Sequence, residues 1–172
     1  GMDHFALPDD ALAVAKRQGR LHRNFQGYST QPDCDLIGLG VSAISKVGPT
    51  YSQNVRELDQ YYERLNAGRL PTARGVLLEH DDLLRRAVIM ALMCHFHVSK
   101  EAIEAAYLIR FDEYFGRELE DLRDFEEAGL VEISADWISV LPKGKLLVRG
   151  IAMVFDRYLR QDQRLRRYSK IV

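Results

Sequence analysis

Cysteine is scarce in this chain, and its scarcity excludes two kinds of protein. The 172 residues contain two cysteines, Cys34 and Cys94, far apart in the sequence. Small secreted domains that depend on disulfides carry a much denser cysteine pattern. Two thiols are also too few to hold an iron–sulfur cluster. The sequence leaves a single disulfide between Cys34 and Cys94 open, but it predicts no cysteine framework.

Long apolar runs and a strong net charge are missing as well. No stretch approaches the roughly 20 apolar residues that span a membrane, and no basic and then apolar leader is present. The formal net charge is −1. The whole molecule therefore has no electrostatic attraction to nucleic acid or to an anionic membrane. We expect a cytoplasmic protein that binds neither.

The first part of the chain, up to about residue 70, has the pattern of an incomplete α/β sheet. Asp9 or Asp10 can cap a helix that ends at Gly19. Strands are expected over residues 2–7, 24–29 and 36–45, and a helix over 55–66. Strand, helix, strand and strand are too few elements for a complete sheet of this class.

The second part has a different, mostly helical pattern. Helices are expected over residues 81–97, from the N-cap Ser99 to about 109, and over 112–128. Two short strands, 130–133 and 137–140, then form a hairpin. A last helix begins at Pro142 and runs to about residue 159. Three helices, a hairpin and a closing helix are the order of a winged-helix unit.

A winged-helix order raises DNA binding, and the charges argue against it. A recognition helix must approach phosphates and should therefore be basic. Residues 112–128 instead contain eight acidic and two basic side chains. The tail over residues 157–170 is basic, with six basic side chains and one acidic. It is typical of an exposed helix end, and an anionic partner with several carboxylates is the alternative.

Three short patterns suggest chemistry, and each favours a structural interpretation. Residues 38–43 (GLGVSA) match a dinucleotide fingerprint, but Gly48-Pro49 prevents the helix which that motif requires. The glycines instead indicate a close approach to the backbone. Cys94 and His97 share a helix face that excludes His95, so three metal ligands do not converge. His4 beside Asp3 would face the opposite side of a strand.

Several segments together resemble a known enzyme family. In order and spacing they are similar to the oxygen-independent coproporphyrinogen III oxidases, and the resemblance covers essentially the whole chain. The segments are residues 1–10 (GMDHFALPDD), 22–28 (HRNFQGY), 36–45 (LIGLGVSAIS), Gln60-Tyr61-Tyr62, Arg74-Gly75, Asp82, Arg85-Arg86, Gly129-Leu130-Val131, Lys143-Gly144, Phe155-Asp156 and Tyr158-Leu159-Arg160.

The resemblance implies a radical S-adenosylmethionine enzyme that is far longer than this chain. In that family an N-terminal CxxxCxxC motif holds a [4Fe–4S] cluster, and S-adenosylmethionine supplies the radical that starts the oxidative decarboxylation of two propionates of coproporphyrinogen III. The product is protoporphyrinogen IX, a haem precursor. This sequence lacks the motif. We therefore expect the isolated chain to be inactive, with neither cofactor and no metal bound.

The resemblance also implies a fold and site residues. The expected fold is α+β: terminal elements of a radical-SAM (partial TIM-type) barrel over residues 1–54, a linking helix over 55–70, and a mostly helical, winged-helix-like domain over 71–172. Ile44 matches a family position that contacts a second S-adenosylmethionine. Phe25 and Gln26 match positions near the active site.

Two other functions and one association remain open. A related branch acts as a haem chaperone, so the chain is alternatively a haem- or partner-binding module without oxidase activity. The HRNFQGY segment, residues 22–28, favours the oxidase branch. A winged-helix DNA regulator is the third candidate. An incomplete sheet also leaves an unpaired edge, which predicts self-association through residues 1–55.

Overall fold

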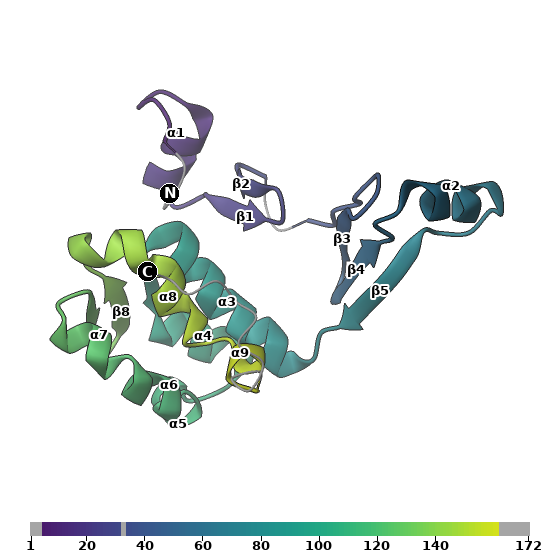
Figure 1. The fold of residues 1–172 in the computed structure, drawn as a ribbon. Helices are drawn as coiled ribbons and strands as arrows, with labels where there is room; N and C mark the ends of the chain where they lie inside the picture. Colours follow the sequence, from purple (N-terminus) through teal and green to yellow (C-terminus); the bar gives the residue numbers. More distant parts are fainter. Residues whose placement is uncertain (1–4, 32–33, 162–172) are drawn as a thin grey trace. The chain divides into compact units, whose positions relative to one another are not determined.

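The chain forms two compact units in the computed structural model, which describes residues 5–31 and 34–161 (Figure 1). One unit combines the chain up to Thr30 with the chain from Leu84 onward, and the other is Gln31–Leu83. The two units are defined by contacts between residues and are not the same as the predicted domains. The domain boundaries that the resemblance implies, at residues 54 and 70, stay a prediction.

A helix and a hairpin open the first unit. The helix α1 (Ala11–Arg17) begins where the Asp10 carboxylate accepts the N–H of Leu12 at 2.8 Å, and Gly19 follows it with φ +67°. This confirms the predicted helix and both of its ends. Strands β1 (His22–Asn24) and β2 (Gly27–Ser29) then pair antiparallel.

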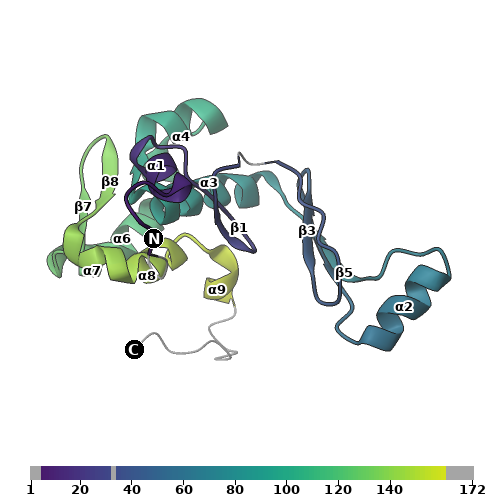
Figure 2. The ribbon, with the colours of Figure 1, turned by 90° about the horizontal axis from the view of Figure 1, so that it is seen from above.

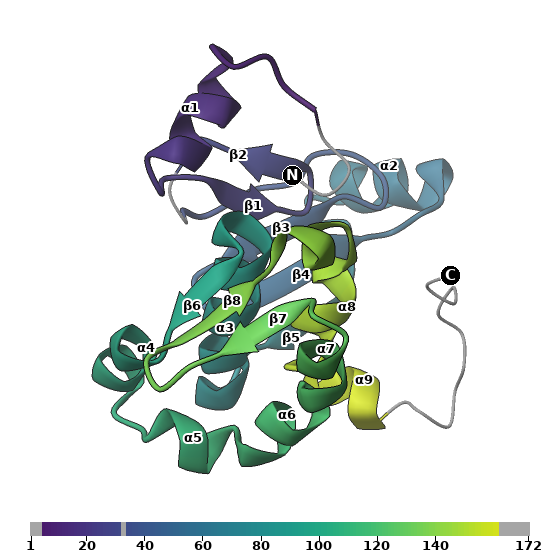
Figure 3. The same ribbon diagram turned by 90° about the vertical axis from the view of Figure 1, so that its left-hand side faces the viewer.

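The remainder of the first unit packs helices on a small sheet. Helix α4 (Lys100–Tyr107) agrees with the prediction, and the Ser99 hydroxyl caps it. Helix α3 (His80–His95) ends two residues earlier than predicted, because Phe96 has φ 64°, so Cys94 and His97 do not share a helix face. Strands β7 (Val131–Ile133) and β8 (Trp137–Val140) form the expected hairpin. A further strand, β6 (His97–Ser99), pairs with β8 and gives the order β6-β8-β7. Figure 3 shows these strands side by side with α3 behind them.

Two predicted helices are interrupted. The segment 112–128 forms α5 (Phe111–Tyr114), α6 (Gly116–Asp121) and α7 (Arg123–Glu127). Phe115 leaves the helical region, and the weak helix former Gly116 follows it. The last helix divides into a 3₁₀ turn η1 (Pro142–Leu147), α8 (Val148–Met153) and α9 (Arg157–Gln161). The Asp156 carboxylate accepts the N–H groups of residues 158 and 159 and so starts a new helix.

The core of the first unit explains why Phe115 departs from the helix. Its ring lies 4.8 Å from that of Phe111 and 5.4 Å from that of Phe155, and all three side chains are fully buried. Truncating such a phenylalanine costs about 3–5 kcal/mol. A nearly buried ion pair, Arg85 Nη1 to Glu118 Oε1 at 2.9 Å, closes the same region. Arg85 also donates to the Phe155 carbonyl, which ties α3, α6 and the end of α8 together.

The second unit is a three-stranded antiparallel sheet with one helix. Strands β3 (Ile44–Val47), β4 (Thr50–Asn54) and β5 (Thr72–Leu77) pair in the order β3-β4-β5, and α2 (Leu58–Asn66) connects the last two (Figure 2). β5 was not predicted, because its residues TARGVL are almost all exposed and show no apolar alternation. Arg64 of α2 donates to the Thr72 carbonyl at 2.5 Å, which fixes the helix to the start of β5.

Candidate functional site

Ile44 begins β3 and is half-buried. A strand over residues 36–45 was predicted, and this prediction is wrong in its bounds. Gly40 has φ 101° and Ser42 has φ 57°, both outside the range of a strand. Leu36 alone forms an isolated bridge with Lys46. Residues 37–43 are therefore a loop that leads into the strand at Ile44.

Polar side chains hold this loop against the sheet. The buried Asn54 donates to the carbonyls of Gly38 and Gly40 at 3.2 and 2.9 Å. Gly38 N–H donates to Ser45 Oγ at 3.0 Å, and Gly40 N–H donates to the Tyr61 hydroxyl at 3.0 Å. This network fixes the backbone on both sides of Ile44. If the loop moved away, the buried Asn54 amide would lose its hydrogen-bond partners, which costs free energy.

Gly38 lies so close to Ile44 that no other residue fits. A Cβ atom on Gly38 would stand 2.7 Å from the Ile44 carbonyl oxygen. The predicted close backbone approach is thus confirmed for Gly38, and the approaching group is the chain's own strand; at Gly40 nothing lies within 4 Å of a Cβ position, and its φ of 101° is what favours glycine there. The matching dinucleotide fingerprint has no helix after it in the structure.

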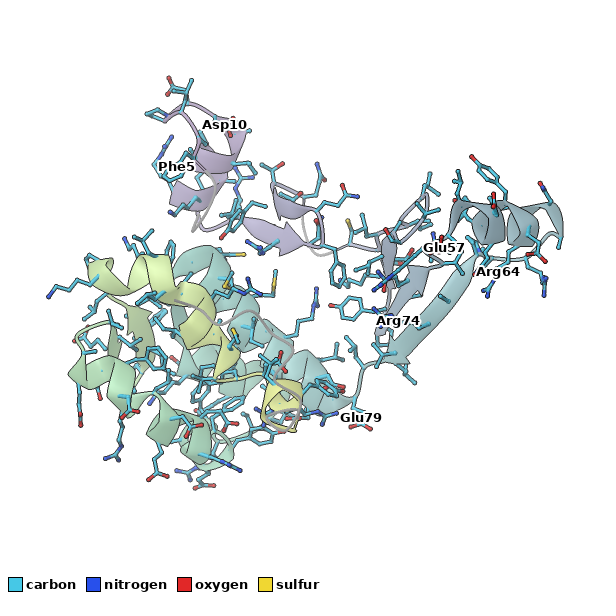
Figure 4. All side chains as sticks on the ribbon, viewed as in Figure 1. Phe5, Asp10, Glu57, Arg64, Arg74 and Glu79 are labelled. Atoms are coloured by element: carbon cyan, nitrogen blue, oxygen red, sulfur yellow. The ribbon has the colours of Figure 1, made fainter. Side chains whose placement is uncertain are left out.

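Gln53 and Arg74 are opposite Ile44 along one row of the sheet. Ile44 pairs with Gln53 of β4, and Gln53 pairs with Arg74 of β5. Arg74 Nε and Nη2 donate to Gln53 Oε1 at 2.9 and 2.7 Å, and Gln53 Nε2 donates to the Ser42 carbonyl at 3.0 Å. Figure 4 labels Arg74 on β5, beside β4. Sequence reasoning missed both residues as site candidates, because only the strand register brings them together.

Phe25 and Gln26 form the turn between β1 and β2. A strand over residues 24–29 was predicted, but these two residues connect two strands instead. Gln26 N–H donates to the Asn24 side-chain oxygen at 2.8 Å, and Gly27 has φ 124°. The Phe25 side chain is 53% exposed. Phe25 and Gln26 belong to the first unit, and Ile44 belongs to the second. The site roles of all three residues stay predictions.

Cys94, His95 and His97 show different environments. Cys94 is 2% exposed, and burial raises the pKa of its thiol from 9.0 to about 11, an effect that Arg23 partly opposes. Burial lowers the pKa of His95, and the nearby His97 and His22 lower it further. The Cys94 thiol is thus fully buried, while His95 is half-buried and His97 is exposed. In the described ranges, no three histidine, cysteine or carboxylate side chains are grouped as metal ligands.

The residues of this chain do not fit an iron–sulfur cluster. Such a cluster needs several cysteine thiolates within bonding distance of the irons. The chain has only Cys34 and Cys94; both are free, the first exposed and the second buried in the core of the first unit. Cluster chemistry therefore has no ligands here. The free thiols also answer the open question of a disulfide between them.

Several acidic side chains of residues 112–128 have structural partners. Asp112 Oδ1 lies 2.7 Å from Lys100 Nζ, and Glu118 pairs with Arg85. The expectation that this segment does not bind DNA stays a prediction. The basic tail lies largely outside the described residues, as do His4, Asp3 and the first half of the strand predicted over 2–7. Residues 5–7 form no strand, so that prediction is wrong for the part that the structure describes. No helix in the described ranges is long and apolar enough to span a membrane.

The known proteins that are similar to this chain include oxygen-independent coproporphyrinogen III oxidases. The family model of the HemN C-terminal domain matches residues 78–147. An oxygen-independent coproporphyrinogen III oxidase of Salmonella typhimurium is 50% identical over the whole chain, and that of Escherichia coli K12 is 48% identical. The chain spans 38% of the length of each.

A solved structure gives the same result at the level of the fold. It is coproporphyrinogen III oxidase (HemN) from Escherichia coli, described as a radical SAM enzyme. It matches with a TM-score of 0.89 and 49% identity, over 92% of this chain and 36% of that one. The chain therefore belongs to the oxygen-independent coproporphyrinogen III oxidase family and corresponds to its C-terminal part.

Proposed function

We propose that this chain acts as the C-terminal part of an oxygen-independent coproporphyrinogen III oxidase. The enzyme would oxidatively decarboxylate two propionates of coproporphyrinogen III to give protoporphyrinogen IX in cytoplasmic haem biosynthesis. The supporting observation is that all 172 residues align with such oxidases at 48 to 50% sequence identity. The cluster and its CxxxCxxC ligands must come from residues outside this sequence, so the chain alone is inactive.

In this function Ile44 contacts S-adenosylmethionine, and Phe25 and Gln26 lie near the active site. The fixed loop before Ile44 supports the first role, since a contact residue must be held in place before the ligand arrives. The exposed ring of Phe25 can pack on an apolar surface, and Gln26 can donate and accept hydrogen bonds.

The two parts of the chain would then have different tasks. Residues 1–54 supply terminal elements of the barrel, and the winged-helix-like part over 71–172 helps to enclose the tetrapyrrole. The order α3, β6, α4, α5–α7, β7, β8 supports the winged-helix assignment. The largely exposed side chains of β5 support a role for the second unit within a larger protein.

A chimera tests this proposal directly. The matching C-terminal part of the Escherichia coli oxidase is replaced by this chain, and anaerobic conversion of coproporphyrinogen III is measured with S-adenosylmethionine and a reductant. We expect conversion by the chimera and none by the truncated oxidase. An inactive, correctly folded chimera would contradict the proposal and favour the haem- or partner-binding module.

The same chimera tests Ile44. Ile44→Asp puts a carboxylate at the contact position and should raise the KM for S-adenosylmethionine by about tenfold or more. Val47→Asp is the matched control, because Val47 lies on the same strand with its side chain on the opposite face. Equal effects of the two substitutions would argue against a ligand contact at Ile44.

A further inference from the structure

We propose that Arg74 binds a carboxylate of the ligand that contacts Ile44. The inference rests on the proposed function and deepens it, because it names the chemical group that this face of the sheet recognises. It concerns residues of the second unit alone. Nothing in the sequence pattern singles out Arg74 for this role; the strand register and its hydrogen bonds do.

The register puts three side chains on one face. Residues directly opposite each other in an antiparallel pair project to the same side of the sheet. Ile44 is opposite Gln53, and Gln53 is opposite Arg74. The guanidinium of Arg74 therefore shares a face with the proposed contact residue, one strand further away.

Gln53 orients the guanidinium without neutralising it. Its Oε1 accepts from both Arg74 Nε and Arg74 Nη2, and its own amide is held by the Ser42 carbonyl. A guanidinium carries five N–H donors, so three remain after these two bonds. Arg74 is exposed and has no carboxylate partner in the ranges that the structure describes. An oriented arginine with spare donors is a typical carboxylate receptor.

The neighbouring row extends the same chemistry. Lys46, Tyr51 and Val76 are opposite one another and two residues away from the first row, so they share its face. The two rows together combine two cations, one amide and three largely apolar side chains, with no acidic residue. This composition suits an anion that carries an apolar or aromatic body.

Two ligands of the proposed reaction carry such a group. S-adenosylmethionine has one carboxylate beside an adenosyl group, and the tetrapyrrole has propionates on a large apolar ring. The chemistry that Arg74 would recognise is the same in both. Binding measurements with each ligand and its carboxylate-free counterpart distinguish the two sources.

The test measures binding to the purified chimera, prepared without its iron–sulfur cluster, because the rest of the oxidase completes the ligand site around this chain. The probes are S-adenosylmethionine, decarboxylated S-adenosylmethionine, coproporphyrin III and its methyl ester, titrated by calorimetry or fluorescence. Arg74→Gln removes the charge, Arg74→Lys keeps it, and Arg69→Gln is the control, since it removes an exposed arginine from the loop after α2. Circular dichroism confirms that each variant folds.

We expect Arg74→Gln to lower the affinity for one of the two carboxylate ligands by about tenfold or more. Arg74→Lys should recover part of this affinity, and Arg69→Gln should bind like the wild type. The carboxylate-free counterpart of the ligand should bind to all variants with the same affinity. The ligand that responds identifies the source. Equal affinities of the wild type and Arg74→Gln, or no binding of either ligand to the wild type, would overturn the inference. The proposed function would stand in that case if the chimera is active and Ile44→Asp raises its KM.

Discussion

The two cysteines show how far the surroundings of single residues determine their chemistry. Cys34 is exposed, and Cys94 is buried beside Ala15 and Leu21. Because the pKa of Cys94 is about 11, only about one in a thousand of its thiols is ionised at pH 8. A thiol reagent should therefore label Cys34 quickly and Cys94 only after unfolding, and Cys34→Ser should abolish the fast reaction. Rapid labelling of that variant would contradict the buried position.

Cys94 also predicts a dependence of stability on pH. The folded chain holds the thiol proton more tightly than the unfolded chain does, since the pKa rises from 9.0 to about 11 on folding. This contribution is complete below pH 9 and is lost as the pH rises towards 11. The free energy of unfolding of the wild-type chain should fall across that window. The free energy of unfolding of the Cys94→Ala variant should fall less. An equal decline in both proteins would assign the effect to other groups.

At the scale of elements, the first helix depends on a single cap. The Asp10 carboxylate accepts the N–H of Leu12, and Figure 4 labels this residue at the start of α1. Asp10→Ala should destabilise α1 by about 1 kcal/mol. Hydrogen exchange of the α1 amides measures this loss. Asp9→Ala is the matched control, because it removes the same charge from the adjacent exposed position, and equal exchange in both variants would contradict the cap.

Elements with local signals were predictable from the sequence, and those without were not. Asp10, Ser99 and Gly19 are cap residues, and the helix boundaries beside them agree with the structure. β5 escaped prediction, because a short exposed strand has no apolar pattern and owes its conformation to pairing with β4. The break at Phe115 also escaped, since burial of its ring between Phe111 and Phe155 overrides the helical periodicity.

For the whole molecule, the sequence predicts self-association through residues 1–55. Exposed apolar side chains such as Ile37 and Leu39, 73% and 85% exposed, lie within that range. We expect the mass from light scattering to rise with concentration and Leu39→Lys to reduce the rise. Leu77→Lys is the control, because Leu77 is also an exposed leucine, at 69%, but lies on β5. A monomeric mass at high concentration would exclude association, and a response of Leu77→Lys alone would assign it to β5.

The sequence by itself determined the family, the lack of cluster ligands and most helices of the chain. These properties depend on residue identity and on local spacing, which the sequence states directly. Only the tertiary structure decided that Ile44 starts its strand, that Phe25 and Gln26 form a turn, and that Arg74 shares a face with Ile44. Strand register and side-chain burial join residues that are distant in the sequence, so no local pattern can fix them.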